Sequence, residues 1–300
     1  MTNTTTAMNV KDATDAKGGW WLLTGGNGFL GAGLIASLDA ETRARCVCVV
    51  RKRTPEFAAT VGAVIEGAFN DEDTLRALAD YRITAVVHLA AVTGGCSEAD
   101  GMAVNVEGTR VLMRSLVAQG CRRFVLASSV AATGLQRTDF CPVELPMTEE
   151  HPCLDKDGYG FSKYLMEEVA RYQQRQEPAV TVVCLRFGAI CPDDAAASPF
   201  VPETAPPAWT YAHFSRVYRR DAVRAIRLAL NKPSAGGFLA VNVVARQSAL
   251  AGTVRELVER WHPEWTGDLT AYDRAGHERD AVFCTKRAEA ELGFVAEWPE

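Results

Sequence analysis

A tyrosine and a lysine stand four residues apart in Tyr159-Gly-Phe-Ser-Lys163, at the start of a stretch with helical spacing. Side chains four residues apart share one face of a helix, so the phenol and the ammonium group should point the same way. A free tyrosine has a pKa of about 10, which is too high for proton transfer near neutral pH. Because a neighbouring cation favours the phenolate, we expect Lys163 to lower the pKa of Tyr159 and make it a general acid and base.

Two serines follow an apolar run at residues 124–127 that predicts a strand. In a doubly wound sheet, ligands bind at the carboxyl ends of the strands. We therefore expect Ser129 beside Tyr159, where its hydroxyl would hold the oxygen of a substrate carbonyl or alcohol. Either serine could instead cap a helix, and Ser128 is the candidate for that structural role.

A glycine-rich loop, Thr24-Gly-Gly-Asn-Gly-Phe-Leu-Gly31, follows a predicted strand and opens a predicted helix. Gly25 permits a tight turn, Gly28 lets the backbone approach a pyrophosphate, and Gly31 lets the helix pack close to the strand. The helix start offers free N–H groups to the phosphates. We expect a dinucleotide here, with Lys163 reaching its ribose; a turn without a ligand is the alternative. The candidate cofactor residues of the loop are Thr24, Gly25, Asn27, Gly28, Phe29, Leu30 and Gly31.

A basic cluster, Arg51-Lys52-Arg53, ends the second predicted strand, where proteins that bind NAD usually place an acidic residue for the ribose 2′-hydroxyl. A guanidinium forms charge-assisted, often bidentate hydrogen bonds with phosphate, so the cluster suits the 2′-phosphate of NADP. Arg51 is the candidate for this contact, with NADP as the expected cofactor and NAD as the alternative. A solvated strand end with three surface cations would look the same.

The elements that must position these residues alternate along the chain. Short apolar runs separated by longer amphipathic stretches are typical of βαβ units and a parallel sheet. Right-handed crossovers place helices on both faces, so we predict an α/β fold with a doubly wound, Rossmann-like parallel sheet and a smaller C-terminal substrate lobe. Predicted strands cover residues 20–23, 45–50, 63–66, 85–89, 124–127, 180–185 and 238–244, and predicted helices cover 28–38, 71–79, 104–118, 159–174, 253–261 and 286–292.

Changes in composition along the sequence predict how the chain is divided into a leader, a domain and a lobe. Residues 1–18 predict a disordered leader, and residues 19–188 with about 215–245 predict the dinucleotide-binding domain. A small substrate-binding lobe would combine residues 189–214 with 246–300. Within it, residues 191–207 are rich in Pro, Ala and Asp and predict a long loop over the active site.

Composition argues against several classes of protein. A formal net charge of -5 and a pI near 5.7 provide no basic face, so we expect no nucleic-acid partner. No run of about 18 apolar residues occurs, and the N-terminus lacks the apolar core of a signal peptide, so we expect a cytoplasmic protein without a membrane contact. Nine cysteines without a CxxC pair and five scattered histidines predict no metal site.

Together these motifs resemble the extended short-chain dehydrogenase/reductase family, which contains sugar-nucleotide epimerases, dehydratases and ketoreductases. The resemblance implies Ser129, Tyr159 and Lys163 as the catalytic trio and Ala90 and Ala91 along the cofactor channel. It also implies a homodimer formed through the helices at 104–118 and 159–174. The matching segments are TGGNGFLG at 24–31, VVHLAA at 86–91, NVEGT at 105–109, SSVAATG at 128–134, YGFSK at 159–163, LRFGAICP at 185–192, RRDAVRAI at 219–226 and TKRAEAELGF at 285–294.

Departures from the family pattern bear on the reaction. Val130 and Ala131 stand where the dehydratases carry an Asp-Glu pair, which disfavours dehydration. Ala189 stands near the position of an asparagine that meets the nucleotide diphosphate in epimerases, which weakens the case for a UDP-sugar. The segment at 185–193 is similar to that of uronate dehydrogenases, which use NAD. Residues 67–69 lack the aspartate that usually holds the adenine amino group.

The resulting hypothesis is a ketoreductase that interconverts a carbonyl and a secondary alcohol on a small sugar-like substrate. Tyr159 would supply the proton, while Thr93 and Arg216 are further candidates for substrate contact, as are the neighbouring Arg219 and Arg220. The alternative is a sugar or sugar-nucleotide epimerase with tightly bound NAD. A non-catalytic NADP-sensing protein is a third hypothesis, disfavoured because the tyrosine and the lysine are both present.

Overall fold

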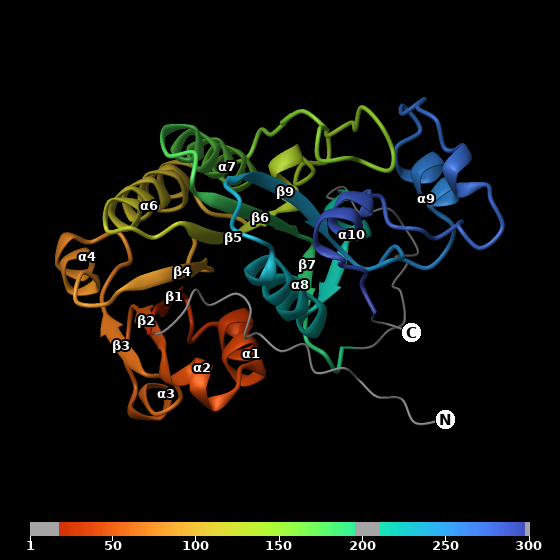
Figure 1. The fold of residues 1–300 in the computed structure, drawn as a ribbon. Coiled ribbons are helices and arrows are strands. Elements are labelled where there is room, and N and C mark those ends of the chain that lie inside the picture. Colours follow the sequence, from red (N-terminus) through yellow and green to blue (C-terminus); the bar gives the residue numbers. More distant parts are fainter. Residues whose placement is uncertain (1–17, 196–210, 298–300) are drawn as a thin grey trace, which may run out of the picture.

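A computed structural model describes residues 18–195 and 211–297 of the chain. Its centre is a seven-stranded sheet in the order β3-β2-β1-β4-β5-β6-β9, with every neighbouring pair parallel (Figure 1). The chain winds outward from β1 to one edge and then from β4 to the other, so the sheet is doubly wound, as predicted. The strands are β1 (Trp20–Thr24), β2 (Cys46–Val50), β3 (Ala63–Glu66), β4 (Ile83–His88), β5 (Arg123–Ser129), β6 (Thr181–Phe187) and β9 (Gly237–Val243).

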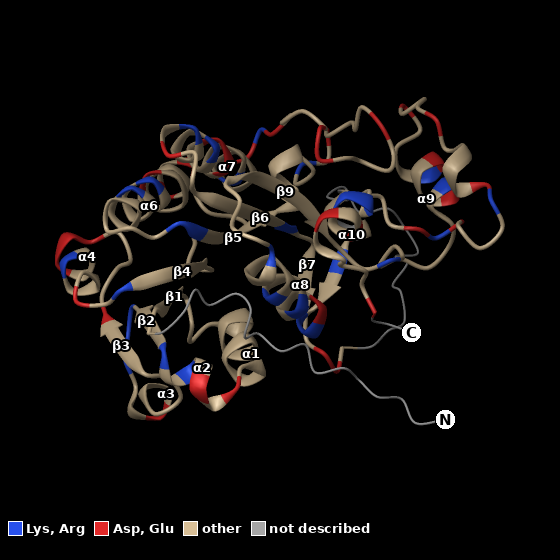
Figure 2. Ribbon diagram, viewed as in Figure 1, with Lys and Arg blue, Asp and Glu red and all other residues tan. Residues whose placement is uncertain are grey.

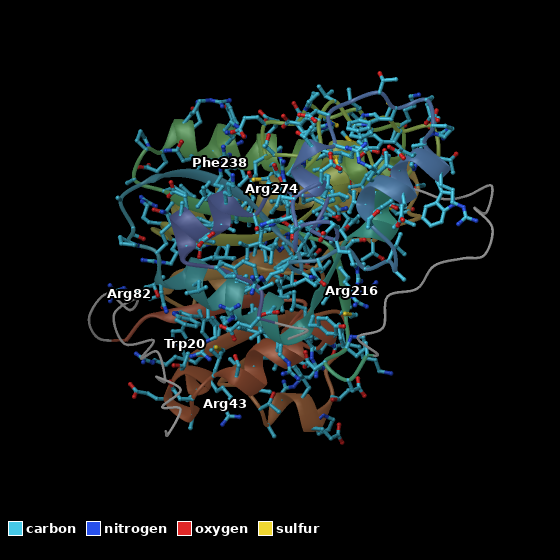
Figure 3. The ribbon with its side chains drawn as sticks, turned by 90° about the vertical axis from the view of Figure 1, so that its right-hand side faces the viewer. Trp20, Arg43, Arg82, Arg216, Phe238 and Arg274 are labelled. Atoms are coloured by element: carbon cyan, nitrogen blue, oxygen red, sulfur yellow. The ribbon has the colours of Figure 1, made fainter. Side chains whose placement is uncertain are left out.

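The winding direction reverses between β1 and β4. Thr24, the last residue of β1, pairs with Val49 of β2 on one side and with His88 of β4 on the other. Three strand ends therefore meet at this edge, where open α/β sheets form their ligand crevice. Figure 3 places Trp20, at the start of β1, on one side of the molecule and Arg216 on the other.

Helices cover both faces of the sheet, which explains why strands such as β2 and β6 are buried along their whole length. One face carries α1 (Phe29–Ser37), α8 (Arg219–Asn231) and α10 (Lys286–Leu292) in a single hydrophobic cluster (Figure 1). The opposite face carries α4 (Glu72–Leu78), α6 (Thr109–Ala118) and α7 (Gly158–Gln176). Two short helices, α2 (Ala40–Ala44) and α3 (Pro55–Ala58), stand beside β2 in the sequence.

The helix predicted at 104–118 has two parts. A short helix, α5 (Glu98–Asp100), leads into a wide π-helical segment, η2 (Gly101–Gly108), and α6 continues from it. Asn105 in this segment is buried, exchanges two hydrogen bonds of 3.0 Å with the backbone of Val92, and donates to Ser162 at 2.9 Å. The wide turn thus ties the loop after β4 to α7, in keeping with the occurrence of π-helical turns at functional sites.

A third hydrophobic cluster lies beside the sheet and joins residues 130–147 to parts of the chain after residue 210. By contrast, Ala288 and Leu292 of α10 pack with the cluster of α1 and α8. The division into 19–188 with about 215–245, and 189–214 with 246–300, stays a prediction; residues 1–17 and most of the loop at 191–207 lie outside the described residues. The smaller elements are η3 (Val130–Thr133), β7 (Ala189–Cys191), η4 (Tyr211–Phe214), β8 (Arg216–Tyr218), α9 (Val254–Trp261) and η5 (Thr270–Tyr272).

Charged side chains of both signs are interspersed on the helices (Figure 2). Among the residues that the structure describes, no helix combines the length and the apolar character needed to cross a bilayer.

Candidate active site

The glycine-rich loop turns from β1 into α1 and leaves a cradle at the helix start. Gly25 has a φ of +70°, a backbone conformation that favours glycine. A Cβ atom on Gly31 would lie 2.3 Å from the carbonyl oxygen of Gly25, so the helix packs against the loop only with glycine here. Gly28 begins α1 without a side-chain cap, which leaves the first N–H groups of the helix available to a phosphate. These features fit a dinucleotide.

A cavity of about 340 Å³, the cofactor cavity, lies between this loop and the ends of β2, β3 and β4. Arg51 lines it, whereas Lys52 and Arg53 do not. Asn27 also lines it and donates to the Lys52 carbonyl at 3.4 Å. The complete lining is Gly25, Asn27, Gly28, Val49, Val50, Arg51, Gly67, Ala68, Phe69, Asn70, Leu89, Ala90, Ala91, Val92 and Val104.

Four candidate residues of the loop do not line this cavity: Thr24, Phe29, Leu30 and Gly31. The buried Thr24 hydroxyl lies 2.7 Å from Nδ1 of His88 and accepts the Ala90 N–H at 3.2 Å, so it fixes the ends of β1 and β4. Burial lowers the pKa of His88 to about 3, which keeps the imidazole neutral. Phe29 is 46% exposed, and its ring centre lies 4.9 Å from the guanidinium carbon of Arg219.

Ser129, Tyr159 and Lys163 lie together on the wall of a second cavity of about 320 Å³, the catalytic cavity. This cavity shares Leu89 and Ala91 with the cofactor cavity, so the two adjoin. The end of β5 supplies Ser129, and the beginning of α7 supplies the other two side chains. Lys163 Nζ lies 5.9 Å from the centre of the Tyr159 ring. The arrangement brings a proton donor, a hydroxyl group and a cation to the carboxyl edge of the sheet.

Burial dominates the ionisation of the trio. It raises the pKa of Tyr159, and the adjacent Ser129 side chain opposes that rise. It also lowers the pKa of Lys163 to about 8. The expectation that Lys163 lowers the pKa of Tyr159 is therefore wrong for this arrangement, because burial raises that pKa and Lys163 Nζ donates to the Ala127 carbonyl at 2.8 Å. At neutral pH Tyr159 holds its proton, which is the form that can protonate an alkoxide.

The capping role expected of Ser128 at the end of β5 falls to Ser129, which also lines the catalytic cavity. Ser129, rather than Ser128, caps the short helix η3, since its Oγ accepts the Ala131 N–H at 3.1 Å. Ser128 Oγ is buried and donates to Glu167 at 2.5 Å. Glu167 also accepts two hydrogen bonds from Arg186, of 2.9 and 2.7 Å, so a buried ion pair ties α7 to β5 and β6.

Some of the residues proposed from sequence line the remaining wall of the catalytic cavity, and others do not. Thr93 and Leu30 line it, whereas Arg216 does not. Arg216 lies in β8 with its guanidinium carbon 5.3 Å from the centre of the Tyr218 ring. Sequence reasoning singled out neither Gln136 nor Ser215, and no local motif marks either of them. The wall is completed by Gly94, Ala127, Ser128, Val130, Leu135, Phe187, Gly188, Ala189, Ile190 and Ala212.

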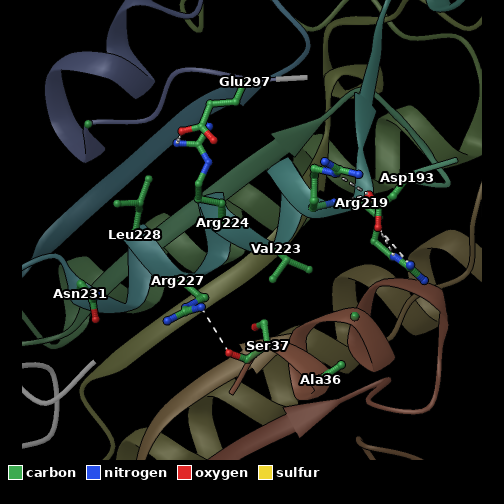
Figure 4. A pocket seen from close by; sticks show the side chains of 13 residues that line it. Ala36, Ser37, Asp193, Arg219, Val223, Arg224, Arg227, Leu228, Asn231 and Glu297 are labelled. Atoms are coloured by element: carbon green, nitrogen blue, oxygen red, sulfur yellow. Dashed lines mark hydrogen bonds and ion pairs between the residues drawn. The ribbon is translucent and has the colours of Figure 1, made fainter. Parts of the chain in front are cut away.

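A larger cavity of about 840 Å³ lies between α1, α8 and the segment that follows α10 (Figure 4). Arg219 and Arg220 line it, and both bind Asp193, through a side-chain contact of 3.0 Å and a backbone N–H contact of 2.7 Å. Arg224 in the same cavity pairs with Glu297 at 3.2 Å. This cavity shares no lining residue with the catalytic cavity, so the structure places Arg219 and Arg220 away from the trio. Within the described residues, no three His, Cys, Asp or Glu side chains gather as a metal site.

The doubly wound sheet, the glycine cradle and the Ser-Tyr-Lys trio together resemble the extended short-chain dehydrogenase/reductase type. Comparison with protein families agrees, since the model of the NAD dependent epimerase/dehydratase family matches residues 21–204. The chain belongs to this family.

Relatives of known activity include epimerases. The chain is 28% identical to UDP-glucose 4-epimerase 2 from Oryza sativa subsp. japonica, over 55% of this chain and 43% of the rice protein. It spans about half the length of the curated relatives it matches.

Solved structures with a similar fold cover nearly the whole chain. A short-chain dehydrogenase/reductase superfamily protein from Agrobacterium tumefaciens with bound NAD is 26% identical, with a TM-score of 0.65 and 93% of each chain covered. The UDP-glucose 4-epimerase from Brucella ovis in complex with NAD has a TM-score of 0.67 at 21% identity, with 94% of each chain covered. At that identity the second likeness is one of fold.

Proposed function

We propose that this chain is a sugar epimerase that oxidises a secondary alcohol transiently and reduces it again on the other face, with NAD as the retained cofactor. The observation that carries the proposal is the placement of Ser129, Tyr159 and Lys163 on one wall, next to the cofactor cavity. Sequence relatives named UDP-glucose 4-epimerase favour epimerisation over the ketoreductase hypothesis, and a nucleotide sugar such as UDP-glucose is the first substrate to test.

Each member of the trio has a task in this reaction. Ser129 holds the oxygen of the reacting carbon by a hydrogen bond. The phenolate form of Tyr159 takes the hydroxyl proton during oxidation, and the resulting phenol, the form that burial favours, returns it during reduction. Lys163 binds the cofactor ribose and places a positive charge near the phenol. When bound, the nicotinamide ring accepts the hydride and gives it back. No net proton or electron is consumed, because the second half of the reaction reverses the first.

A second candidate function is a dehydrogenase or ketoreductase with an exchangeable cofactor. Two observations favour it. The catalytic cavity of about 320 Å³ is near the lower limit of small-molecule sites, about 300 Å³, and Ala189 presents only a methyl group there. Arg51 lines the cofactor cavity, where its guanidinium suits the 2′-phosphate of NADP.

The two functions differ in what happens to the cofactor. We would release the bound dinucleotide from purified protein by denaturation, and then incubate intact protein with UDP-glucose while recording both its NMR spectrum and the near-ultraviolet absorbance of reduced cofactor. The proposal predicts about one NAD per chain, the appearance of the 4-epimer and a constant absorbance. Protein that arrives without dinucleotide and accumulates reduced cofactor with a simple sugar would favour the dehydrogenase. Protein that binds no dinucleotide would overturn both functions.

We also propose a homodimer in which α6 and α7 of each protomer form the interface. The support is the family to which the chain belongs and the adjacent position of these helices on one face of the sheet.

A further inference from the structure

Two carboxyl groups stand side by side directly before Tyr159. Asp157 caps α7, since its Oδ1 accepts the N–H groups of Tyr159 and Gly160, both at 3.0 Å. Asp155 lies next to it, with its Oδ1 3.4 Å from the Asp157 nitrogen and its carboxyl group within hydrogen-bonding range of the Asp157 carboxyl group. Two ionised carboxylates have no donor to share, so a hydrogen bond between them requires that one carries a proton.

The surroundings assign that proton to Asp155. Oδ1 of Asp157 already accepts two N–H groups, whereas Oδ1 of Asp155 accepts one. Oδ2 of Asp155 and Oδ2 of Asp157 are both buried and accept no hydrogen bond from the described residues. A proton on Asp155 turns one buried acceptor into a donor that the adjacent Asp157 side chain can accept. Burial and the adjacent Asp157 raise the pKa of Asp155 to about 8, in the same direction.

Asp155 also lies where the two halves of the catalytic wall meet. A Cβ atom on Gly160 would be 1.6 Å from Asp155 Oδ2 and 2.5 Å from the Ala131 carbonyl oxygen, so both oxygens touch the first turn of α7. The preceding Leu154 N–H donates to the Thr133 carbonyl at 3.0 Å. The carboxyl group therefore sits between η3, which is capped by Ser129, and the helix that carries Tyr159.

We propose that protonated Asp155 is a positioning residue that fixes the position of Tyr159 relative to Ser129, and that its ionisation loosens this arrangement. Upon ionisation the proton passes to solvent, and the new charge faces both Asp157 and the Ala131 carbonyl. The effect on turnover rests on the proposed function, whereas the shared proton does not.

The other charged or titratable groups around Asp155 do not neutralise that new charge. Lys156 and Arg137 line one cavity together with Asp155, but both bind Asp139 there, at 2.9 Å each. The thiol of Cys153 lies beside the pair, and burial raises its pKa. The remaining neighbour, the phenol of Tyr159 on α7, is itself protonated at neutral pH because burial raises its pKa.

The first test detects the shared proton from the pH dependence of the free energy of unfolding, without a substrate. The pKa of Asp155 lies above its unfolded value of about 3.9, so the folded chain holds one proton more between that value and about 8. The unfolding constant attributable to this group should therefore rise by up to about tenfold per pH unit as the pH rises through that window. Urea unfolding at several pH values should show this loss in the unaltered protein, whereas Asp155→Asn, which keeps a donor but does not titrate, should lose the slope. Equal slopes in both proteins would overturn the proposal.

The second test measures positioning through the pH profile of turnover. Asp155→Asn should stay active and lose the part of the decline above about pH 8 that Asp155 causes, whereas Asp155→Ala should lose turnover at all pH values by about 100-fold, as expected for a misplaced catalytic group. Asp73→Asn, which removes an exposed carboxylate paired with Arg76 on α4, is the control and should keep the unaltered profile. A decline that survives intact in Asp155→Asn belongs to another group, such as Lys163, and contradicts the positioning role. If no substrate is turned over, the proposed function fails and the stability slopes still decide the shared proton.

Discussion

At the scale of single residues, Arg51 and Arg53 form a matched pair for the cofactor question, because only Arg51 lines the cofactor cavity. If the chain accepts NADP, Arg51→Ala should weaken NADPH binding by about 10- to 100-fold, since a hydrogen bond to a charged group is worth about 1.5–3 kcal/mol. Binding of NADH should change little, and Arg53→Ala should leave both affinities intact. Quenching of tryptophan fluorescence measures all four. Unchanged NADPH affinity in Arg51→Ala would make the arginine part of a solvated strand end and leave NAD as the cofactor.

The residue types of the trio could be predicted because helical spacing alone places Tyr159 and Lys163 on one face. The roles of the two serines could not. Adjacent residues of a strand point to opposite faces, and only the assembled sheet shows that Ser128 donates to Glu167 while Ser129 caps η3. The ionisation of Tyr159 was also beyond prediction, because it depends on burial by segments distant in the sequence.

At the scale of elements, the buried pair of Glu167 and Arg186 holds α7 on the sheet. Glu167→Ala should lower the free energy of unfolding by about 3–5 kcal/mol, because it leaves a buried guanidinium without its partner. Glu168, the next residue, pairs with Arg171 at the surface, so Glu168→Ala should cost about 1 kcal/mol or less. Urea denaturation compares the two variants. Equal losses would show that the buried pair does not anchor the helix.

The packing of α1 against the glycine-rich loop permits a second comparison. In Gly31→Ala the new methyl group would meet the Gly25 carbonyl oxygen at 2.3 Å, and we expect a loss of about 1–3 kcal/mol together with weaker dinucleotide binding. In Gly33→Ala the nearest atom, at 3.0 Å, belongs to the flexible Arg219 side chain, and the helix gains up to about 1 kcal/mol in propensity. Thermal unfolding with and without NAD tests both. A stable Gly31→Ala that binds NAD normally would contradict the cradle.

The long elements of the fold follow from local patterns, because buried parallel strands are continuous apolar runs and their crossover helices are amphipathic. All seven predicted strands belong to the sheet. The strands β7 and β8 were not predicted, since each has three residues and exists only through pairing with the other. The π-helical turn could not be predicted from the sequence either, because it depends on the contacts of Asn105 with Val92 and Ser162.

At the scale of the whole molecule, the proposed dimer predicts that a new charge within the interface would prevent dimerisation. Tyr172 on α7 is 49% exposed and lies near enough to Arg110 of α6 to influence its pKa. Tyr172→Glu should convert the dimer to a monomer in light scattering, because a charge in an apolar interface is costly. Val143, which is 65% exposed and lies outside these helices, provides the control, and Val143→Glu should remain dimeric. A monomeric unaltered protein, or a dimer that survives Tyr172→Glu, would exclude this interface.

The lobe structure also belongs to this scale and was only partly accessible from sequence. The third hydrophobic cluster recruits Phe140 and Met147 from the middle of the chain, while Phe294 joins the main core. No continuous stretch of sequence marks this cluster, because packing partners such as Met147 and Phe283 are separated by more than a hundred residues.

The proposed reaction depends above all on proton transfer by Tyr159. The most direct measurement compares the unaltered protein, Tyr159→Phe and Tyr164→Phe for turnover of the proposed nucleotide sugar and for dinucleotide content in the same preparations. Tyr164 is the control, since it lies on α7 but does not line the catalytic cavity. We predict that Tyr159→Phe loses about 10²- to 10⁴-fold in turnover while it keeps its dinucleotide, and that Tyr164→Phe resembles the unaltered protein. Turnover by Tyr159→Phe within a few-fold of the unaltered protein would contradict the account.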